Sequence, residues 1–151
     1  MIMKLNINDR AALAIKNNTK RVEIRANKEN SKQDYSKLKE NDIIKFTSNN
    51  LGIFYVKVKE VNHYETLDEL FTLEGTRYTT SSTNDKEEAI KNVSKLDGYE
   101  EAIKKNGVYA IHIEYLYSEN IVWEELYEKA KNVRNPRDVS GMISAGGVGA
   151  A

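Results

Sequence analysis

The fold is decided by residues 43–61, which read IIKFTSNNLGIFYVKVKEV. Residues 43–47 form a short apolar run that is typical of a strand, and residues 53–61 alternate apolar with polar side chains. The polar segment 49–52 between the two runs is typical of a turn. Residues 43–61 therefore predict a β-hairpin whose second strand buries Phe54, Val56 and Val58.

Strand patterns also occur towards both ends of the chain. Residues 3–7 and 20–25 alternate in the same way, and residues 108–117 form a strong β run. In that last run we expect one face to lie in the core, namely Tyr109, Ile111, Ile113 and Tyr115.

Short helices are predicted between these strands. Asn8 or Asp9 can cap a helix over residues 11–16, and Thr66 with Glu69 forms a capping box that starts a helix ending at Gly75. Two more helices are predicted over residues 85–96 and 99–105, whereas residues 26–41 and 76–84 are predicted loops, the first with a helical turn near residues 34–38. Five or six strands without βαβ alternation predict an α+β fold built on a closed or nearly closed β-barrel.

Length and composition limit the classes of function. A chain of 151 residues with 40% hydrophobic residues predicts one domain with an appendage. No apolar run is long enough for a membrane helix, and the N-terminus lacks the apolar core of a signal peptide, so we expect a cytoplasmic protein. The chain has no cysteine and two histidines, so we expect no metal and no cofactor.

The charges are unevenly distributed along a chain whose formal net charge is zero. Residues 1–60 contain 13 Lys and Arg against 7 Asp and Glu, whereas residues 61–118 contain 6 against 11. The basic first half is either ordinary solvated surface or a face that binds phosphates.

The pattern changes after residue 118. Val122, Leu126, Tyr127 and Ala130 fit one face of a helix, and the chain then ends in a Gly- and Ala-rich segment. We therefore divide the chain into a domain over residues 1–118 and a C-terminal stretch over residues 119–151, the possible start of a second domain. That stretch has too few apolar side chains to fold alone.

Several short motifs in order resemble the ASCH domain of the PUA-like superfamily over residues 3–117. That family has a K-x-x-E-x-R strand, matched by Lys20, Glu23 and Arg25, and a G-D-x-I-x-F segment, matched by residues 41–46 with Asn41 in place of glycine. Residues 64–70 and 99–113 resemble its later helices and closing strand. The resemblance implies a PUA-like mixed β-barrel with a cleft for RNA or a modified nucleoside.

One branch of that family is similar in outline and hydrolyses 4-acetylcytidine with a Lys, a Thr and a Glu. The resemblance places Lys20 on the lysine position and Glu23 on the threonine position, which departs from the hydrolase pattern. Glu74 is the nearest candidate for the glutamate. Whether this chain is an enzyme is therefore left open, with Lys20, Glu23 and Glu74 as its candidate catalytic residues.

The residue types at Lys20, Glu23 and Arg25 allow three interpretations. They could form an ion-pair ladder that is mechanistically silent, a catalytic group in a desolvated cleft, or a binding site in which the cations contact phosphate and Glu23 accepts from the amino group of cytosine. Single-stranded RNA is also held by stacking on aromatic rings. For that role we single out Tyr78 and Tyr99, which flank the Thr- and Ser-rich segment.

Residues 121–151 resemble the N-terminal start of a cytidine deaminase, in which a helix leads through a Pro-containing segment into a Gly-Ala strand. The zinc ligands and the catalytic Glu of such an enzyme would lie beyond Ala151, so no deaminase activity is expected from this chain. A flexible or cleaved tail is the alternative. A non-enzymatic regulatory module of a larger fusion protein is the third functional alternative. The expected partner is RNA or a modified cytidine nucleoside, and the sequence leaves the ligand and the oligomeric state open.

Overall fold

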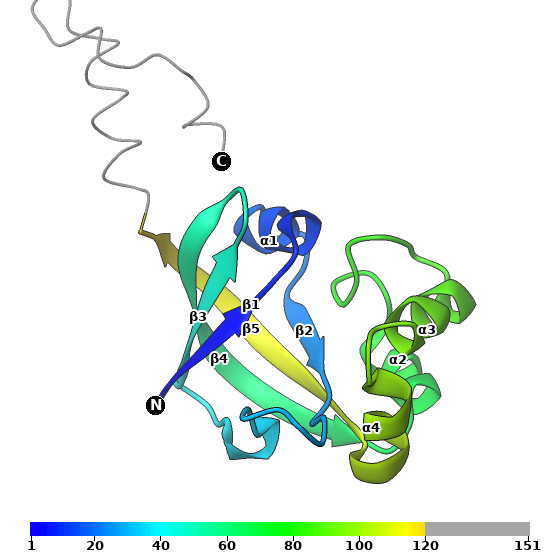
Figure 1. Cartoon of the computed structure of the whole chain (residues 1–151). Coiled ribbons are helices and arrows are strands. Elements are labelled where there is room, and N and C mark those ends of the chain that lie inside the picture. The colour runs from blue at the N-terminus through cyan, green and yellow to red at the C-terminus, as the bar shows by residue number, and fades with distance from the viewer. Residues whose placement is uncertain (120–151) are drawn as a thin grey trace, which may run out of the picture.

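The computed structural model describes residues 1–119, which form one curled five-stranded sheet with the first helix at the top of the view and three further helices gathered at the right (Figure 1). The elements in chain order are β1 (Ile2–Asn6), α1 (Asp9–Lys16), β2 (Val22–Arg25), the 3₁₀ turn η1 (Tyr35–Lys37), β3 (Ile43–Ser48), β4 (Gly52–Tyr64), α2 (Leu67–Glu74), α3 (Lys86–Ser94), α4 (Tyr99–Asn106) and β5 (Val108–Ser118). The predicted helix after residue 121 and the deaminase-like segment lie outside the described residues. In the described part, no helix is long and apolar enough to cross a membrane.

The strand order is β1-β3-β4-β5-β2. β3 and β4 form the predicted hairpin, in which Phe46 pairs with Phe54, and β4 continues as the antiparallel partner of β5. β1 pairs with β3 in parallel, and β2 pairs with β5, where Val22 lies opposite His112. The sheet curls into a half-barrel, so its two outer strands, β1 and β2, face each other across an open seam (Figure 1). The predicted α+β, PUA-like fold class is confirmed.

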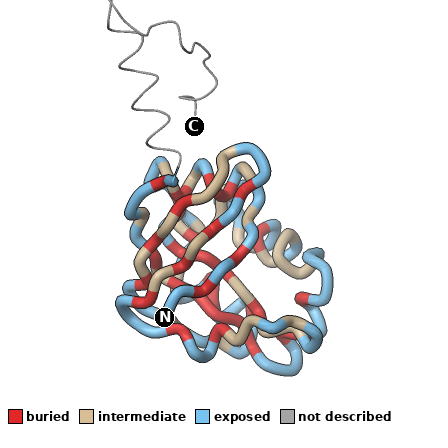
Figure 2. The backbone as a smooth tube through the Cα atoms, turned by 60° about the vertical axis from the view of Figure 1, so that its left-hand side comes forward, coloured by how far each residue is buried: buried red, intermediate tan, exposed pale blue. Residues whose placement is uncertain are grey.

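Buried residues, red in Figure 2, recur along the strands, and they form one hydrophobic cluster on each face of the sheet. Inside the curl, Tyr109, Ile111 and Ile113 pack in a cluster with Phe46 and Phe54, which confirms the predicted core face of β5. The opposite face is also buried, because α2, α3 and α4 cover it, and Val108 and Ala110 are completely buried there with Val22, Ile24, Leu70 and Phe71. Alternation along β5 identified the first face only, since small apolar residues give a weak hydrophobic signal.

Capping residues begin three of the helices where the sequence predicted them. The side chains of Asn8, Thr66 and Asp85 each accept a backbone N–H of the first turn of the helix that follows. Asn41 has φ of 75°, the left-handed region that glycine and asparagine tolerate best. That conformation explains why asparagine can stand where the resembling motif has glycine, in the turn before β3.

Candidate functional site

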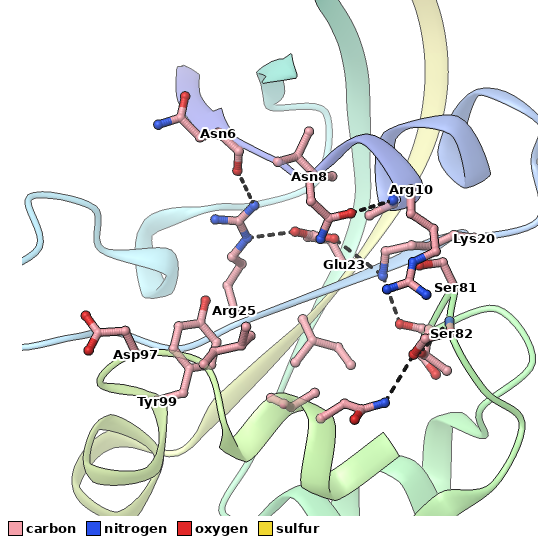
Figure 3. Close-up of a pocket in the computed structure, with 18 of the residues that line it drawn as sticks. Asn6, Asn8, Arg10, Lys20, Glu23, Arg25, Ser81, Ser82, Asp97 and Tyr99 are labelled. Atoms are coloured by element: carbon pink, nitrogen blue, oxygen red, sulfur yellow. Dashed lines mark hydrogen bonds and ion pairs between the residues drawn. The ribbon is translucent and has the colours of Figure 1, made fainter. Parts of the chain in front are cut away.

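A cavity of about 700 Å³ opens along the seam between β1 and β2 (Figure 3). Its wall is built by the end of β1 with the start of α1, by β2, by the Thr- and Ser-rich loop and by α3 and α4. Small-molecule sites in proteins are typically ~300–1,000 Å³, so the cavity could hold a nucleoside. The lining residues that matter below are Asn6, Arg10, Lys20, Glu23, Arg25, Thr80, Ser81, Glu88, Asn92, Asp97 and Tyr99.

Three of the predicted site residues form a buried ion-pair array in this cavity. β2 alternates its side chains, so Val22 and Ile24 enter the helix-side core while Glu23 and Arg25 turn to the opposite face. Arg25 Nε lies 2.7 Å from Glu23 Oε2, and Lys20 Nζ lies 3.4 Å from Glu23 Oε1. The Lys20 and Glu23 side chains are only 6% and 8% exposed. The three charged residues of the K-x-x-E-x-R pattern are therefore in contact, with Glu23 between the two cations.

Lys20 joins the strand to the Thr- and Ser-rich loop. Its Nζ donates to the carbonyl oxygens of Val22 at 2.7 Å and Thr79 at 2.8 Å, so with Glu23 it has a partner for each of its three protons. The carbonyl of Tyr78 accepts the backbone N–H groups of Arg21 and Val22. The loop thus covers the start of the outer edge of β2 and fixes the array in place.

The array keeps Glu23 ionised. Burial by itself would raise the pKa of Glu23, but the Arg25 guanidinium and the Lys20 ammonium outweigh that effect and hold this pKa below its usual range. Burial lowers the pKa of Lys20, with the Glu23 carboxylate acting in the opposite direction. Burial by itself would lower the pKa of Arg25, but the Glu23 carboxylate together with Tyr99 and Tyr35 outweighs that effect and raises the pKa.

Arg25 also connects the two strands across the seam. Its Nη2 donates to the carbonyl oxygen of Asn6 at 2.8 Å, so one guanidinium contacts both β2 and β1 (Figure 3). Tyr99 at the start of α4 lines the same cavity, and burial raises the pKa of its hydroxyl. Among the predicted site residues, the structure therefore brings Lys20, Glu23, Arg25 and Tyr99 together.

The other two predicted site residues lie elsewhere. Glu74 is the last residue of α2 and does not line the cavity. Its buried carboxylate accepts hydrogen bonds from Asn62 at 2.9 Å and Tyr64 at 2.6 Å, and it pairs with His112 at 2.8 Å. Burial would raise the pKa of Glu74, but these partners lower it, and the pKa of Tyr64 rises to about 12. His112 is thus a partnered histidine.

Tyr78 lies outside the lining of the main cavity, and its ring contacts the guanidiniums of two arginines. The Arg21 guanidinium carbon lies 4.0 Å from the centroid of its ring, and that of Arg77 lies 5.1 Å away. Both distances are within the ~6 Å range of a cation–π interaction. Tyr78 therefore positions two positive charges beside the cavity. Its ring contacts the Arg21 and Arg77 guanidiniums.

The structure adds residues that the sequence did not single out. Arg10 lines the cavity, and within residues 1–119 its guanidinium has no hydrogen bond or ion pair. The cavity also contains the side-chain amides of Asn6 and Asn92 and the hydroxyl of Ser81. Only the basic composition of the first half pointed towards Arg10 in the sequence. Its place in the cavity could not be predicted, because it depends on how α1 packs beside the seam. Within the described range, no cluster of three His, Asp or Glu side chains could hold a metal ion.

Comparison with known families identifies the ASCH domain. The model of the ASCH domain family matches residues 5–117, which is most of the described part of the chain. No curated protein sequence matches this chain.

Solved structures with the same fold include two at 28% sequence identity. The crystal structure of hypothetical protein PH0355 has a TM-score of 0.65 and covers 77% of this chain and 100% of its own. The solution NMR structure of protein PF0455 from Pyrococcus furiosus has a TM-score of 0.60, with 77% and 98% covered. A variant of ZmASCH from Zymomonas mobilis is 13% identical, with a TM-score of 0.49 over 91% of this chain and 86% of that one.

Proposed function

This chain belongs to the ASCH domain family, and from that premise we propose that it binds single-stranded RNA, with one nucleoside in the cavity along the β1–β2 seam. The observation that carries the proposal is the cavity itself. It has the volume of a nucleoside site, and its lining combines arginines, side-chain amides and a tyrosine. Proteins bind unpaired bases with the same residue types.

Glu23 supports a cytosine-type base in particular. A carboxylate oxygen can accept two hydrogen bonds, and the Lys20 ammonium lies 3.4 Å from Oε1, a long contact. Oε1 therefore retains the capacity to accept from an exocyclic amino group, as acidic side chains do from cytosine. The ligand class that follows is an unpaired cytidine, with or without a modification.

Arg10 is the residue with which to test RNA binding, because its guanidinium is exposed and has no partner in the described residues. We expect a fluorescently labelled short RNA to bind at low salt, and Arg10→Gln to weaken that binding on the order of tenfold. Fluorescence anisotropy at several salt concentrations measures both the affinity and its salt dependence.

The matched control for Arg10→Gln is Lys59→Gln, which removes one exposed charge from β4 outside the cavity lining. It should leave the affinity unchanged. An RNA that fails to bind at low salt, or equal losses in the two variants, would contradict the proposal.

Hydrolysis of an acylated cytidine is a second candidate, favoured by one observation. The Lys20 amine, whose pKa burial lowers, lies against the Glu23 carboxylate in the cavity wall. To act as a base, Lys20 would first have to lose a proton, and the Glu23 carboxylate opposes that loss because it stabilises the ammonium form. Glu74 lies outside the lining, so this mechanism would depend on Lys20 and Glu23.

The assay for this second candidate is incubation with 4-acetylcytidine, followed by the change in ultraviolet absorbance as cytidine forms. A hydrolase should lose turnover in Lys20→Met and retain it in Glu74→Gln, provided that thermal unfolding shows both variants folded. Absence of turnover in the native protein, or equal turnover in the native protein and Lys20→Met, excludes this activity.

A further inference from the structure

A second cavity of about 310 Å³ lies beside the first. The two share Arg10, Thr80 and Ser81, so these three residues form a wall common to both cavities. Figure 3 shows Arg10 and Ser81 side by side at the edge of the main cavity. The remaining lining of the second cavity consists of Leu13, Ala14, Asn17, Thr19 and Arg77.

The two cavities differ in their charged groups. Three carboxylates line the main cavity, those of Glu23, Glu88 and Asp97, whereas the second cavity has the guanidiniums of Arg10 and Arg77 and no carboxylate. A lining with two cations and no carboxylate favours an anion. Guanidinium groups match the oxygens of a phosphate with two parallel hydrogen bonds.

The donors of the second cavity are available for a ligand. Within residues 1–119, neither Arg10 nor Arg77 has a hydrogen bond or an ion pair, and Arg77 is held by the Tyr78 ring instead. The Ser81 hydroxyl is equally without a partner in the described part. By contrast, the hydroxyl of Thr19 donates to the carbonyl of Ala14, and that of Thr80 pairs with Ser82.

The C-terminal end of α1 borders this cavity, and the free carbonyls of a helix end would repel an anion. Here the last turn is capped. The carbonyl oxygens of Leu13 and Ile15 accept the N–H groups of Asn17 and Asn18. The carbonyl of Ala14 accepts the N–H groups of residues 19 and 20 as well as the Thr19 hydroxyl. This bonding reduces the repulsion that a phosphate would meet.

We propose that the second cavity binds a phosphate group attached to the nucleoside in the main cavity, with Arg77 and Arg10 as its ligands. The inference rests on the proposed function and narrows it. The recognised unit is a nucleoside that carries a phosphate, so a nucleotide within an RNA strand binds more tightly than the free nucleoside. Arg10, on the shared wall, contacts the phosphate while the base lies towards Glu23.

The test compares cytidine, cytidine monophosphate and a short cytidine-containing RNA as ligands of the native protein, Arg77→Gln and Lys59→Gln. We expect Arg77→Gln to weaken RNA binding on the order of tenfold, and to reduce the slope of log affinity against log salt by about 0.7. Cytidine binding should not change. Arg77→Glu should weaken RNA binding further, because it places a carboxylate where the phosphate lies. Circular dichroism establishes that these surface variants are folded.

The outcomes separate the two proposals. RNA binding that is equal in Arg77→Gln and Lys59→Gln overturns the phosphate site and leaves the proposed RNA function standing. Absence of RNA binding by the native protein overturns both. A mononucleotide that binds as tightly as the RNA and is equally sensitive to Arg77→Gln supports the phosphate site, with a free nucleotide as the source of the phosphate.

Discussion

Replacing Glu23 with glutamine is expected to lower the free energy of unfolding by about 3–5 kcal/mol. The substitution keeps the shape of the side chain but removes the carboxylate that lies between Lys20 and Arg25. Two positive charges are then left in a buried site without compensation. Urea unfolding followed by circular dichroism measures the loss.

The double variant Lys20→Met with Glu23→Gln is the control for this prediction. It removes one of the two uncompensated cations, so it should be more stable than Glu23→Gln alone. The pH dependence gives an independent check. The pKa of Glu23 is lowered on folding, so its stabilisation is present above the usual value of 4.5 and is lost as the pH falls through the folded-state pKa. The difference between native protein and Glu23→Gln should therefore shrink in acid, and a constant difference would show that charge is not its cause.

Gly107→Ala is expected to be the second strongly destabilising change. Gly107 ends α4 with φ of 79° and ψ of −166°, a conformation that residues with a Cβ rarely adopt, at a cost of about 1–3 kcal/mol. An added Cβ would also meet the His63 ring, and would lie 2.6 Å from the carbonyl oxygen of Tyr64. We expect this crowding to add about 1–3 kcal/mol, because a backbone group of β4 must move.

Gly75→Ala separates the two contributions. Gly75 ends α2 with φ of 79° and ψ of 178°, but an added Cβ there would meet nothing within 4 Å. Thermal or urea unfolding should therefore show a smaller loss for Gly75→Ala than for Gly107→Ala. Equal losses would mean that the backbone conformation accounts for the whole effect and that β4 yields without cost.

The sequence was sufficient to predict the local elements because their signals are local. Alternation in residues 43–61 placed Phe54, Val56 and Val58 in the core, and Thr66 was recognisable as a cap. The sequence could not predict that β1 pairs in parallel with β3, because pairing between distant strands depends on the packing of the whole sheet. The sequence also did not reveal that helices bury the second face of β5, because the small apolar residues on that face give a weak hydrophobic signal.

The candidate site was predictable where one strand carries it. Glu23 and Arg25 share a face because a strand repeats every two residues, and Lys20 joins them from the segment just before β2. Glu74 was placed with them by resemblance, whereas the structure pairs it with His112 because α2 packs on the helix-covered part of the sheet. Arg10 and Arg77 belong to no recognisable sequence motif. Their place in the second cavity depends on the packing of α1 and of a loop, which the sequence did not reveal.

The pairing of β2 with β5 has a consequence for the order of events during synthesis. The ion-pair residues of β2 leave the ribosome early, yet the strand that they occupy pairs with residues 109–112. A nascent chain that ends before residue 109 contains Glu23 and Arg25 but lacks the part of β5 that positions them. The cavity therefore cannot form before residues 109–112 have been made, and it must bring together residues 84 to 90 positions apart (Arg25 with Tyr109, Val22 with His112), a separation that slows folding.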